Sequence, residues 1–75
     1  MRVYVFNSAT QPDLYAFTPN ALGSNLPAQC GPWNMRKVGE IKSGDLSVFG
    51  ADTAQVILGI NDRGFYLTAA ELQLD

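Results

Sequence analysis

Residues 51–68 have the sequence ADTAQVILGINDRGFYLT, and this stretch decides the fold because it carries signals for both ends of a helix. Asp52 is a favourable N-cap residue, and a glutamine follows it at the spacing of a capping box. Gly64 suits the left-handed conformation in which many helices end. The sequence therefore predicts a helix over residues 52–63, followed by a strand over residues 65–68.

The apolar residues inside this stretch leave a second interpretation open. They recur at helical spacing, at Val56, Ile57 and Ile60. However, residues 56–60 are rich in β-branched side chains, and residues 61–64 could close a four-residue hairpin loop. We favour the helix because both of its ends carry matching signals and because Gly59 would weaken a strand as well. The hairpin remains the alternative.

An N-terminal β-hairpin is the second unit that the sequence predicts. Strands are expected over residues 2–7 and 13–18, where apolar and aromatic side chains are concentrated. The polar loop of residues 8–12 joins them and ends in a proline.

The expected pairing sorts the side chains of this hairpin into two faces. The expected pairing puts Phe6 opposite Tyr15 and Tyr4 opposite Phe17, which makes one face aromatic. The other face carries the aliphatic side chains of Val3, Val5, Leu14 and Ala16. Since neither face is polar, the sheet requires covering on both sides.

Residues 19–34, PNALGSNLPAQCGPWN, are predicted to cover the face that the helix leaves open. The segment has three prolines, two glycines and no regular period, so we expect a long structured loop. Its expected anchors are Leu22, Leu26 and Trp33. A buried indole N–H requires an acceptor, which a backbone carbonyl of this loop can supply.

Short elements are expected in the rest of the chain. Residues 38–41 and 46–49 are predicted strands joined by a turn at 43–45, and residues 68–74 either form a last helical turn or fray. The sequence thus predicts a single domain over residues 1–75 of the α+β class. It would be a small antiparallel sheet of three to five strands, with one helix packed on one face and a long Pro/Gly-rich loop over the other.

Composition and charge narrow the functional classes. Seven acids against five bases give a net charge of −2, which is too mild for a nucleic-acid mimic and of the wrong sign for a general nucleic-acid binder. One cysteine and no histidine provide neither a disulfide nor the usual zinc ligands, so we expect no cofactor and no metal. No apolar run suits a signal peptide or a membrane span, and we expect a cytoplasmic protein without membrane contact.

The residues that could carry chemistry do not predict an enzyme. Cys30 has no histidine to hold its thiolate. Asp52 and Asp62 stand at opposite ends of the predicted helix, roughly 15 Å apart, so they cannot share a proton. No glycine pattern fits a phosphate-binding loop. We therefore predict no catalytic residue.

A candidate binding surface follows from the aromatic face and the loop beside it. Its members are Tyr4, Phe6, Tyr15, Phe17, Cys30 and Trp33. We expect these rings mainly to form a second core layer under the loop. The other interpretations are a contact with a protein partner or a second copy, and stacking of nucleic acid, which too few bases support. A chain this short also gains buried area by dimerising, so a homodimer is expected as one option.

Two motifs carry a resemblance to a group of proteins. A G-x-N-L-P-x-x-x-G-P-W motif spans residues 23–33 after Phe17-Thr18, and R-G-F-Y follows at residues 63–66. This pattern resembles short bacterial proteins that have no assigned activity. The resemblance implies a bacterial cytoplasmic protein, favours a helix before the Gly-Phe-Tyr strand and transfers no catalytic residue.

The function predicted from these observations is that of a non-enzymatic interaction or accessory module in the bacterial cytoplasm. The alternative is a small-ligand-binding domain with a pocket under the loop of residues 19–34. That pocket would be lined by Tyr4, Tyr15, Cys30 and Trp33.

Overall fold

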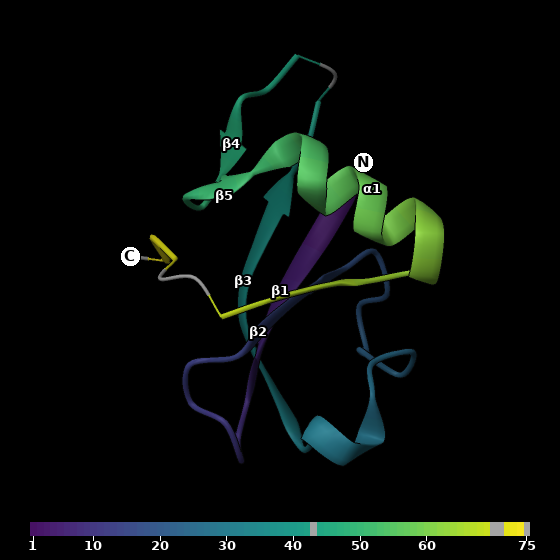
Figure 1. The fold of residues 1–75 in the computed structure, drawn as a ribbon, viewed down its shortest axis with the longest axis vertical. Coiled ribbons are helices and arrows are strands. Elements are labelled where there is room, and N and C mark those ends of the chain that lie inside the picture. The colour runs from purple at the N-terminus through teal and green to yellow at the C-terminus, as the bar shows by residue number, and fades with distance from the viewer. Residues whose placement is uncertain (43, 70–71, 75) are drawn as a thin grey trace.

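A helix lies across one side of a small antiparallel sheet (Figure 1). The computed structural model describes residues 1–42, 44–69 and 72–74. In chain order the elements of these residues are β1 (Arg2–Ser8), β2 (Tyr15–Thr18), the short 3₁₀ helix η1 (Ala28–Cys30), β3 (Trp33–Glu40), β4 (Ser47–Val48), β5 (Ala51–Asp52), α1 (Thr53–Arg63) and β6 (Tyr66–Thr68). The predicted α+β class is confirmed.

The ends of α1 are fixed by the two residues that the sequence singled out. The carboxylate of Asp52 accepts the backbone N–H groups of Ala54 at 2.9 Å and Gln55 at 3.3 Å. Gly64 has φ of 92° and donates its N–H to the carbonyl of Ile60 at 2.8 Å. These bonds satisfy polar groups that a helix end otherwise leaves without partners. The predicted helix is confirmed, and the hairpin alternative is wrong.

The main sheet has the strand order β3-β1-β2-β6, and all of its neighbours are antiparallel. After α1 the left-handed residue Gly64 turns the chain back, so that β6 pairs with β2. The predicted strand after the helix is thereby confirmed. This order leaves β3 and β6 at the two edges of the sheet, and β3 is the longer of these edge strands.

The strand β3 begins earlier than the sequence predicted. A strand was expected from residue 38, but β3 starts at Trp33 because its pairing with β1 extends to that residue. The paired residues run from Arg2 opposite Glu40 to Ser8 opposite Trp33. Pairing with a distant strand therefore gives extended structure to residues whose local sequence did not predict it.

The turn predicted at residues 43–45 is present, since the N–H of Asp45 donates to the carbonyl of Lys42 at 3.1 Å, but the strands on either side of it do not pair with each other. The strand β4 pairs with β5 and not with the strand before it. Two residues, Phe49 with φ of 50° and Gly50 with φ of 88°, connect them. Positive φ at both central residues is the mark of a type I′ hairpin turn. Residue 43 lies outside the described residues.

Apolar side chains pack on both faces of the main sheet. The helix-side core joins α1 and the β4-β5 pair to the sheet through Val3, Val5, Phe17, Ile41, Val48, Ala51, Val56 and Ile60. On the other face, Phe6 and Ala16 pack with Leu26, which comes from the segment between β2 and β3. Half-buried side chains surround this second cluster, namely Tyr4, Trp33, Phe65 and Leu67.

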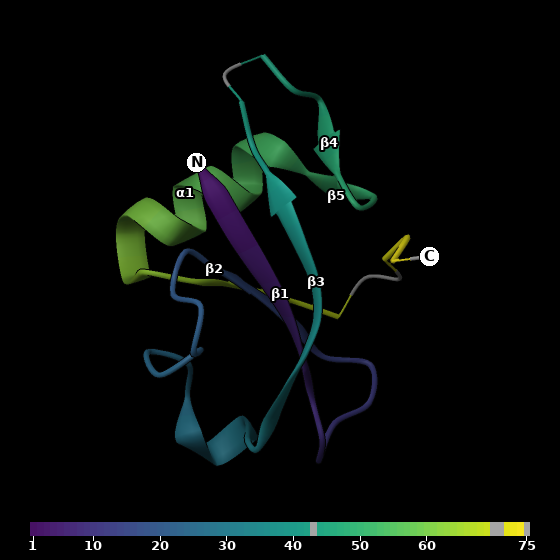
Figure 2. The same cartoon turned by 180° about the vertical axis from the view of Figure 1, so that it is seen from behind.

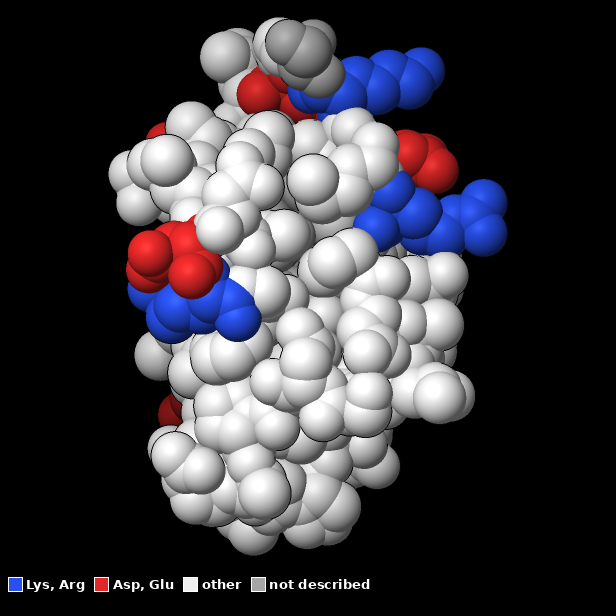
Figure 3. Space-filling model, turned by 90° about the vertical axis from the view of Figure 1, so that its right-hand side faces the viewer, with Lys and Arg blue, Asp and Glu red and all other residues white. Residues whose placement is uncertain are grey.

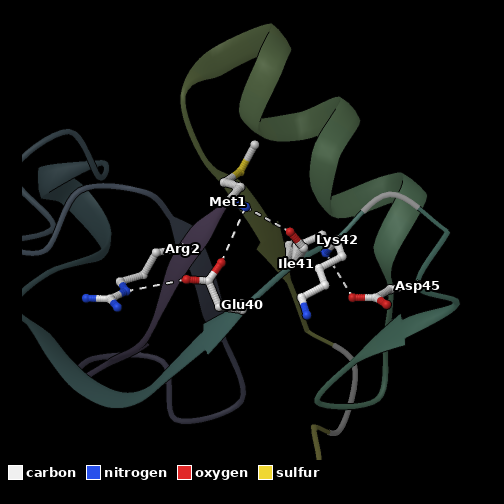
Figure 4. A network of polar contacts seen from close by, with 6 residues as sticks. All are labelled: Met1, Arg2, Glu40, Ile41, Lys42 and Asp45. Atoms are coloured by element: carbon white, nitrogen blue, oxygen red, sulfur yellow. Dashed lines mark hydrogen bonds and ion pairs between the residues drawn. The ribbon is translucent and has the colours of Figure 1, made fainter.

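Polar contacts fasten the start of β1 to the end of β3 (Figure 4). The N–H of Ile41 donates to the carbonyl of Met1, and the amine of Met1 donates to the carbonyl of Ile41, both at 2.8 Å. A carboxylate oxygen of Glu40 lies 3.4 Å from the same amine, and the other lies 3.7 Å from Nε of Arg2. Glu40 is therefore already engaged by two positive groups.

The last described residues do not form the predicted helical turn. Thr68 belongs to β6, and residues 72–74 have no regular structure, although Gln73 donates its N–H to the carbonyl of Phe49 at 2.8 Å. Residues 70 and 71, which carried the rest of that prediction, lie outside the described residues. In the part of the chain that the structure describes, no helix has the length and apolar character needed to cross a membrane.

Candidate interaction surface

The register of the N-terminal hairpin differs by one residue from the predicted one. Tyr4 was expected opposite Phe17, whereas Tyr4 lies opposite Thr18 and Phe17 lies opposite Val5. Ser8, which was assigned to the loop, extends β1 and bonds to Leu14, while β2 begins only at Tyr15, which lies opposite Asn7.

Tertiary hydrogen bonds hold Ser8 in the strand. Its N–H donates to the carbonyl of Leu14 at 3.0 Å, and its hydroxyl accepts the N–H of Gln11 at 3.0 Å. The same hydroxyl donates to the carbonyl of Cys30. Ser8 is 1% exposed, so these bonds take the place of the hydrogen bonds to water that its polar groups lose on burial.

This shift separates the four rings that were predicted to share a face, because a slip of one residue moves side chains to the opposite side. Phe17 is fully buried on the helix side, with half-buried Tyr15 beside it. Phe6, which is 4% exposed, and half-buried Tyr4 lie on the other side. The prediction of one aromatic and one aliphatic face is therefore wrong, and each face mixes both kinds of side chain.

Trp33 and Cys30 lie where the loop of residues 19–34 meets the sheet. The indole N–H of Trp33 donates to the carbonyl of Pro27 at 3.0 Å, so the predicted backbone acceptor is confirmed. Cys30 is half-buried, and its Sγ lies 3.8 Å from Nε2 of Gln11.

The segment between β2 and β3 packs on the sheet through Leu26 and Gly23. Leu26 is buried against Phe6 and Ala16, whereas Leu22, also predicted as an anchor, is 84% exposed. Gly23 has φ of 65°, and a Cβ built there would lie 3.0 Å from Cζ of Phe6. Glycine therefore lets the backbone turn directly over this ring.

Asn25 connects this segment to two others. Its Oδ1 accepts the hydroxyl of Thr18 at 3.0 Å, and its Nδ2 donates to the carbonyl of Gly64 at 2.8 Å. Thr18, Asn25 and Gly64 come from the three parts of the pattern that resembles short bacterial proteins. At these positions the pattern therefore has a structural role.

The residues named for a pocket under the loop do not come together. Tyr4 and Tyr15 lie on opposite faces of the sheet, so they cannot line one cavity. A cleft of about 340 Å³ lies elsewhere, along α1 and β6, and is lined by Gln55, Leu58, Gly59, Asp62, Arg63 and Tyr66. Its two charged groups are engaged with each other, since Nη1 of Arg63 lies 3.3 Å from Oδ2 of Asp62.

An open apolar surface remains at the edge of the sheet, along β3. Met35 lies opposite Phe6 and Val38 opposite Tyr4, which places both on the face turned away from α1. Seen from behind, β1 and β3 lie in front of that helix (Figure 2). Leu26 covers Phe6, but Met35 and Val38 keep 48% and 46% of their surface exposed. We call the edge of the sheet along β3, including side chains of both faces, the β3 surface: Met35, Arg36, Lys37 and Val38, with Tyr4 and Trp33 beside them.

Two bases stand in the middle of the β3 surface. Lys37 lies opposite Val5 and so points to the helix side, while Arg36 sits where the register of β1 and β3 shifts. Among the described residues, neither base forms an ion pair. Sequence analysis missed this site because the exposure of Met35 and Val38 follows from the strand order, which no local pattern encodes.

Charged groups are unevenly distributed over the molecule. From residue 14 to residue 35 the sequence has no Asp, Glu, Lys or Arg. On the side shown in Figure 3, charged side chains gather in the half where β4 lies, and the half formed by residues 19–32 is nearly uncharged. The bases of β3 follow directly after this uncharged stretch.

Comparisons with protein-family models, with curated proteins and with solved structures found no match to this chain. The resemblance of residues 23–33 and 63–66 to short bacterial proteins therefore stays a prediction.

Proposed function

We propose that this chain is a non-enzymatic protein-interaction module that binds its partner through the β3 surface. The observation that carries the proposal is the pair of half-exposed apolar side chains, Met35 and Val38, beside Arg36 on an edge strand. Methionine and arginine are enriched at protein interfaces. An edge strand also offers backbone N–H and C=O groups that its own sheet leaves unpaired.

The non-enzymatic part of the proposal is supported by how the carboxylates are used. Asp52 caps α1, Glu40 engages the Met1 amine and Arg2, and Asp62 is paired with Arg63. A general acid or base has to face a reacting group in a cleft. These carboxylates instead have structural contacts at separate places.

The partner is another protein or a second copy of this chain, and the proposed location is the bacterial cytoplasm that the resemblance implies. Burying Met35 and Val38 would supplement the small core of a chain of 75 residues. Nucleic acid is the least supported partner, because a phosphate backbone needs many cations and β3 supplies two.

A small-ligand-binding domain stays the second candidate, now with the cleft along α1 and β6 as its site. The single supporting observation is the volume of about 340 Å³. Adding a panel of metabolites to the protein in solution and recording its backbone amide chemical shifts by NMR tests this candidate. A ligand in the cleft would move the signals of α1 and leave those of β3 unchanged.

Site-specific photocrosslinking tests the interaction module. A benzophenone amino acid would replace Val38 in one variant and Leu58, which is 61% exposed on the helix, in the control. The proposal expects adducts of defined mass from position 38 in bacterial cells and none of those adducts from position 58. Equal adducts from both positions, or none from position 38, would contradict it. An adduct of twice the mass of the chain identifies a second copy as the partner.

A further inference from the structure

We propose that the partner docks on β3 as an additional strand, and that this strand alternates acidic with apolar side chains. This inference rests on the proposed function, which names the surface, and it adds the chemistry and conformation of the occupant.

The backbone of β3 is suited to receive a strand. Seven of its eight residues lie opposite a residue of β1, Arg36 being skipped at the register shift, and among the described elements no strand pairs with its other side. Addition of an extended segment to such an edge is a common mode of peptide recognition, in which the main chain supplies affinity and alternate side chains supply specificity. The opposite edge, β6, has three residues and offers a much shorter template.

The side chains of β3 set the pattern that an added strand must follow. Lys37 points to the helix side, whereas Met35 and Val38 point to the other side. Directly opposed side chains on neighbouring strands interact most strongly. The added strand should therefore place carboxylates on the side of Lys37 and apolar side chains on the side of Met35 and Val38.

The local charge also favours an acidic partner. Three of the five bases lie within residues 36–42. The acids nearby are engaged elsewhere, since Glu40 contacts Met1 and Arg2, and Asp45 accepts the backbone N–H of Lys42 at 2.9 Å (Figure 4). Among the described residues, no acid is therefore paired with Arg36 or Lys37 at the edge.

The same bases argue against a second copy as the occupant. Two β3 strands paired antiparallel around their middle would bring Arg36 and Lys37 of one chain against the same residues of the other. Like charges directly opposed across strands are destabilising, and bases on an edge strand therefore hinder its pairing with an identical edge. Pairing of β3 with β3 of a second copy is thus disfavoured, and pairing with a strand of opposite charge is favoured.

Synthetic peptides about as long as β3 provide the test, with the full chain as receptor. The first peptide alternates glutamate and valine. The second has the same composition with glutamates and valines in separate blocks, the third has lysine in place of glutamate, and the fourth is the first with alternate backbone nitrogens methylated. Fluorescence anisotropy gives affinities, and backbone amide shifts locate the contact.

We expect the first peptide to bind, to shift the amides of residues 33–40 and to leave those of α1 unmoved. The other three should bind at least about ten-fold more weakly, because each loses charge complementarity, alternation or main-chain hydrogen bonds. In the Lys37→Glu variant the preference should reverse towards the lysine peptide. Arg63→Glu, an equal change of charge on α1, should keep the original preference, and the same spectra report whether both variants are folded.

If the block peptide or the methylated peptide binds as tightly as the first peptide, the partner does not bind as an added strand. If the lysine peptide binds as tightly as the first peptide, the proposal that the partner is acidic is wrong. If the peptides fail in this way while Val38 still gives specific crosslinks, the interaction module stands and its occupant is different. If the crosslinks are absent as well, both proposals fail.

Discussion

Asn25 donates its side-chain amide to the carbonyl of Gly64 at 2.8 Å, and so joins the segment before β3 to the residue that ends α1. The two residues are 39 positions apart in the sequence. Because the other side-chain atom of Asn25 accepts the hydroxyl of Thr18, one residue connects the sheet, the loop and the helix end. Such a residue should matter more for stability than its exposure suggests.

Replacing Asn25 by alanine is therefore expected to lower the free energy of unfolding by about 1–2 kcal/mol, the cost of losing two hydrogen bonds and leaving the Thr18 hydroxyl poorly satisfied. Urea unfolding followed by circular dichroism measures this change. Asn34→Ala is the control, since Asn34 is exposed and has no hydrogen bond from its side chain among the described residues. Equal effects of both substitutions would contradict the connecting role.

Gly59 permits the close approach of α1 and β6. A Cβ built on Gly59 would lie 2.9 Å from both Cβ and Cδ1 of Tyr66. Gly59→Ala should gain about 1 kcal/mol in helix propensity but lose more through overpacking, so we expect a net loss of at least about 1 kcal/mol. Asn61→Ala, at an exposed position of the same helix, should be neutral or slightly stabilising. A more stable Gly59→Ala variant would show that the helix can move away from the strand without cost.

Thr53 carries a buried hydroxyl without a hydrogen-bond partner among the described residues, although its side chain is almost fully covered. Thr53→Val keeps the shape and removes the unsatisfied group, so stability should stay equal or rise by up to about 1 kcal/mol. The control is Thr10→Val, whose hydroxyl contacts the Cys30 carbonyl at 3.3 Å and which should lose stability. A melting temperature that falls for Thr53→Val would reveal an acceptor for this hydroxyl in solution.

Trp33 supports the second core with its ring and its N–H. Trp33→Ala should cost about 2–4 kcal/mol, less than for a fully buried indole because Trp33 is half-buried. Trp33→Phe keeps most of the ring but loses the bond to Pro27, and about 1 kcal/mol is expected. Thermal unfolding of both variants separates the two contributions. Unchanged melting of Trp33→Ala would instead assign the residue to the binding surface.

The helix could be predicted because its signals are local. Asp52 and Gly64 act on backbone groups within a few residues, and both behave as their positions in the sequence indicate. The turn between β4 and β5 was missed for the opposite reason. Phe49 adopts positive φ there, which a phenylalanine rarely does. The residue type at this position therefore did not predict the turn.

The hairpin register and the binding surface depend on contacts that a linear pattern does not contain. Ser8 extends β1, and its hydroxyl donates to the carbonyl of Cys30, which lies 22 positions away in the sequence. Met35 and Val38 are exposed because β3 ends up at the edge of the sheet. The rings were expected mainly as core, and they are buried or half-buried, but on two faces instead of one. No pattern in the sequence predicted that Met35 and Val38 would be exposed.

The helix-side core has a consequence for synthesis on the ribosome. Val5 and Phe17 are completely buried in the finished fold, in a cluster that includes Val56 and Ile60, which are translated 39 to 55 residues later. The exit tunnel of the ribosome also covers the most recently added residues. The N-terminal strands therefore emerge before α1 is available, with their helix-side apolar face exposed to solvent. A nascent chain of this kind is open to association with its neighbours on a polysome until α1 arrives.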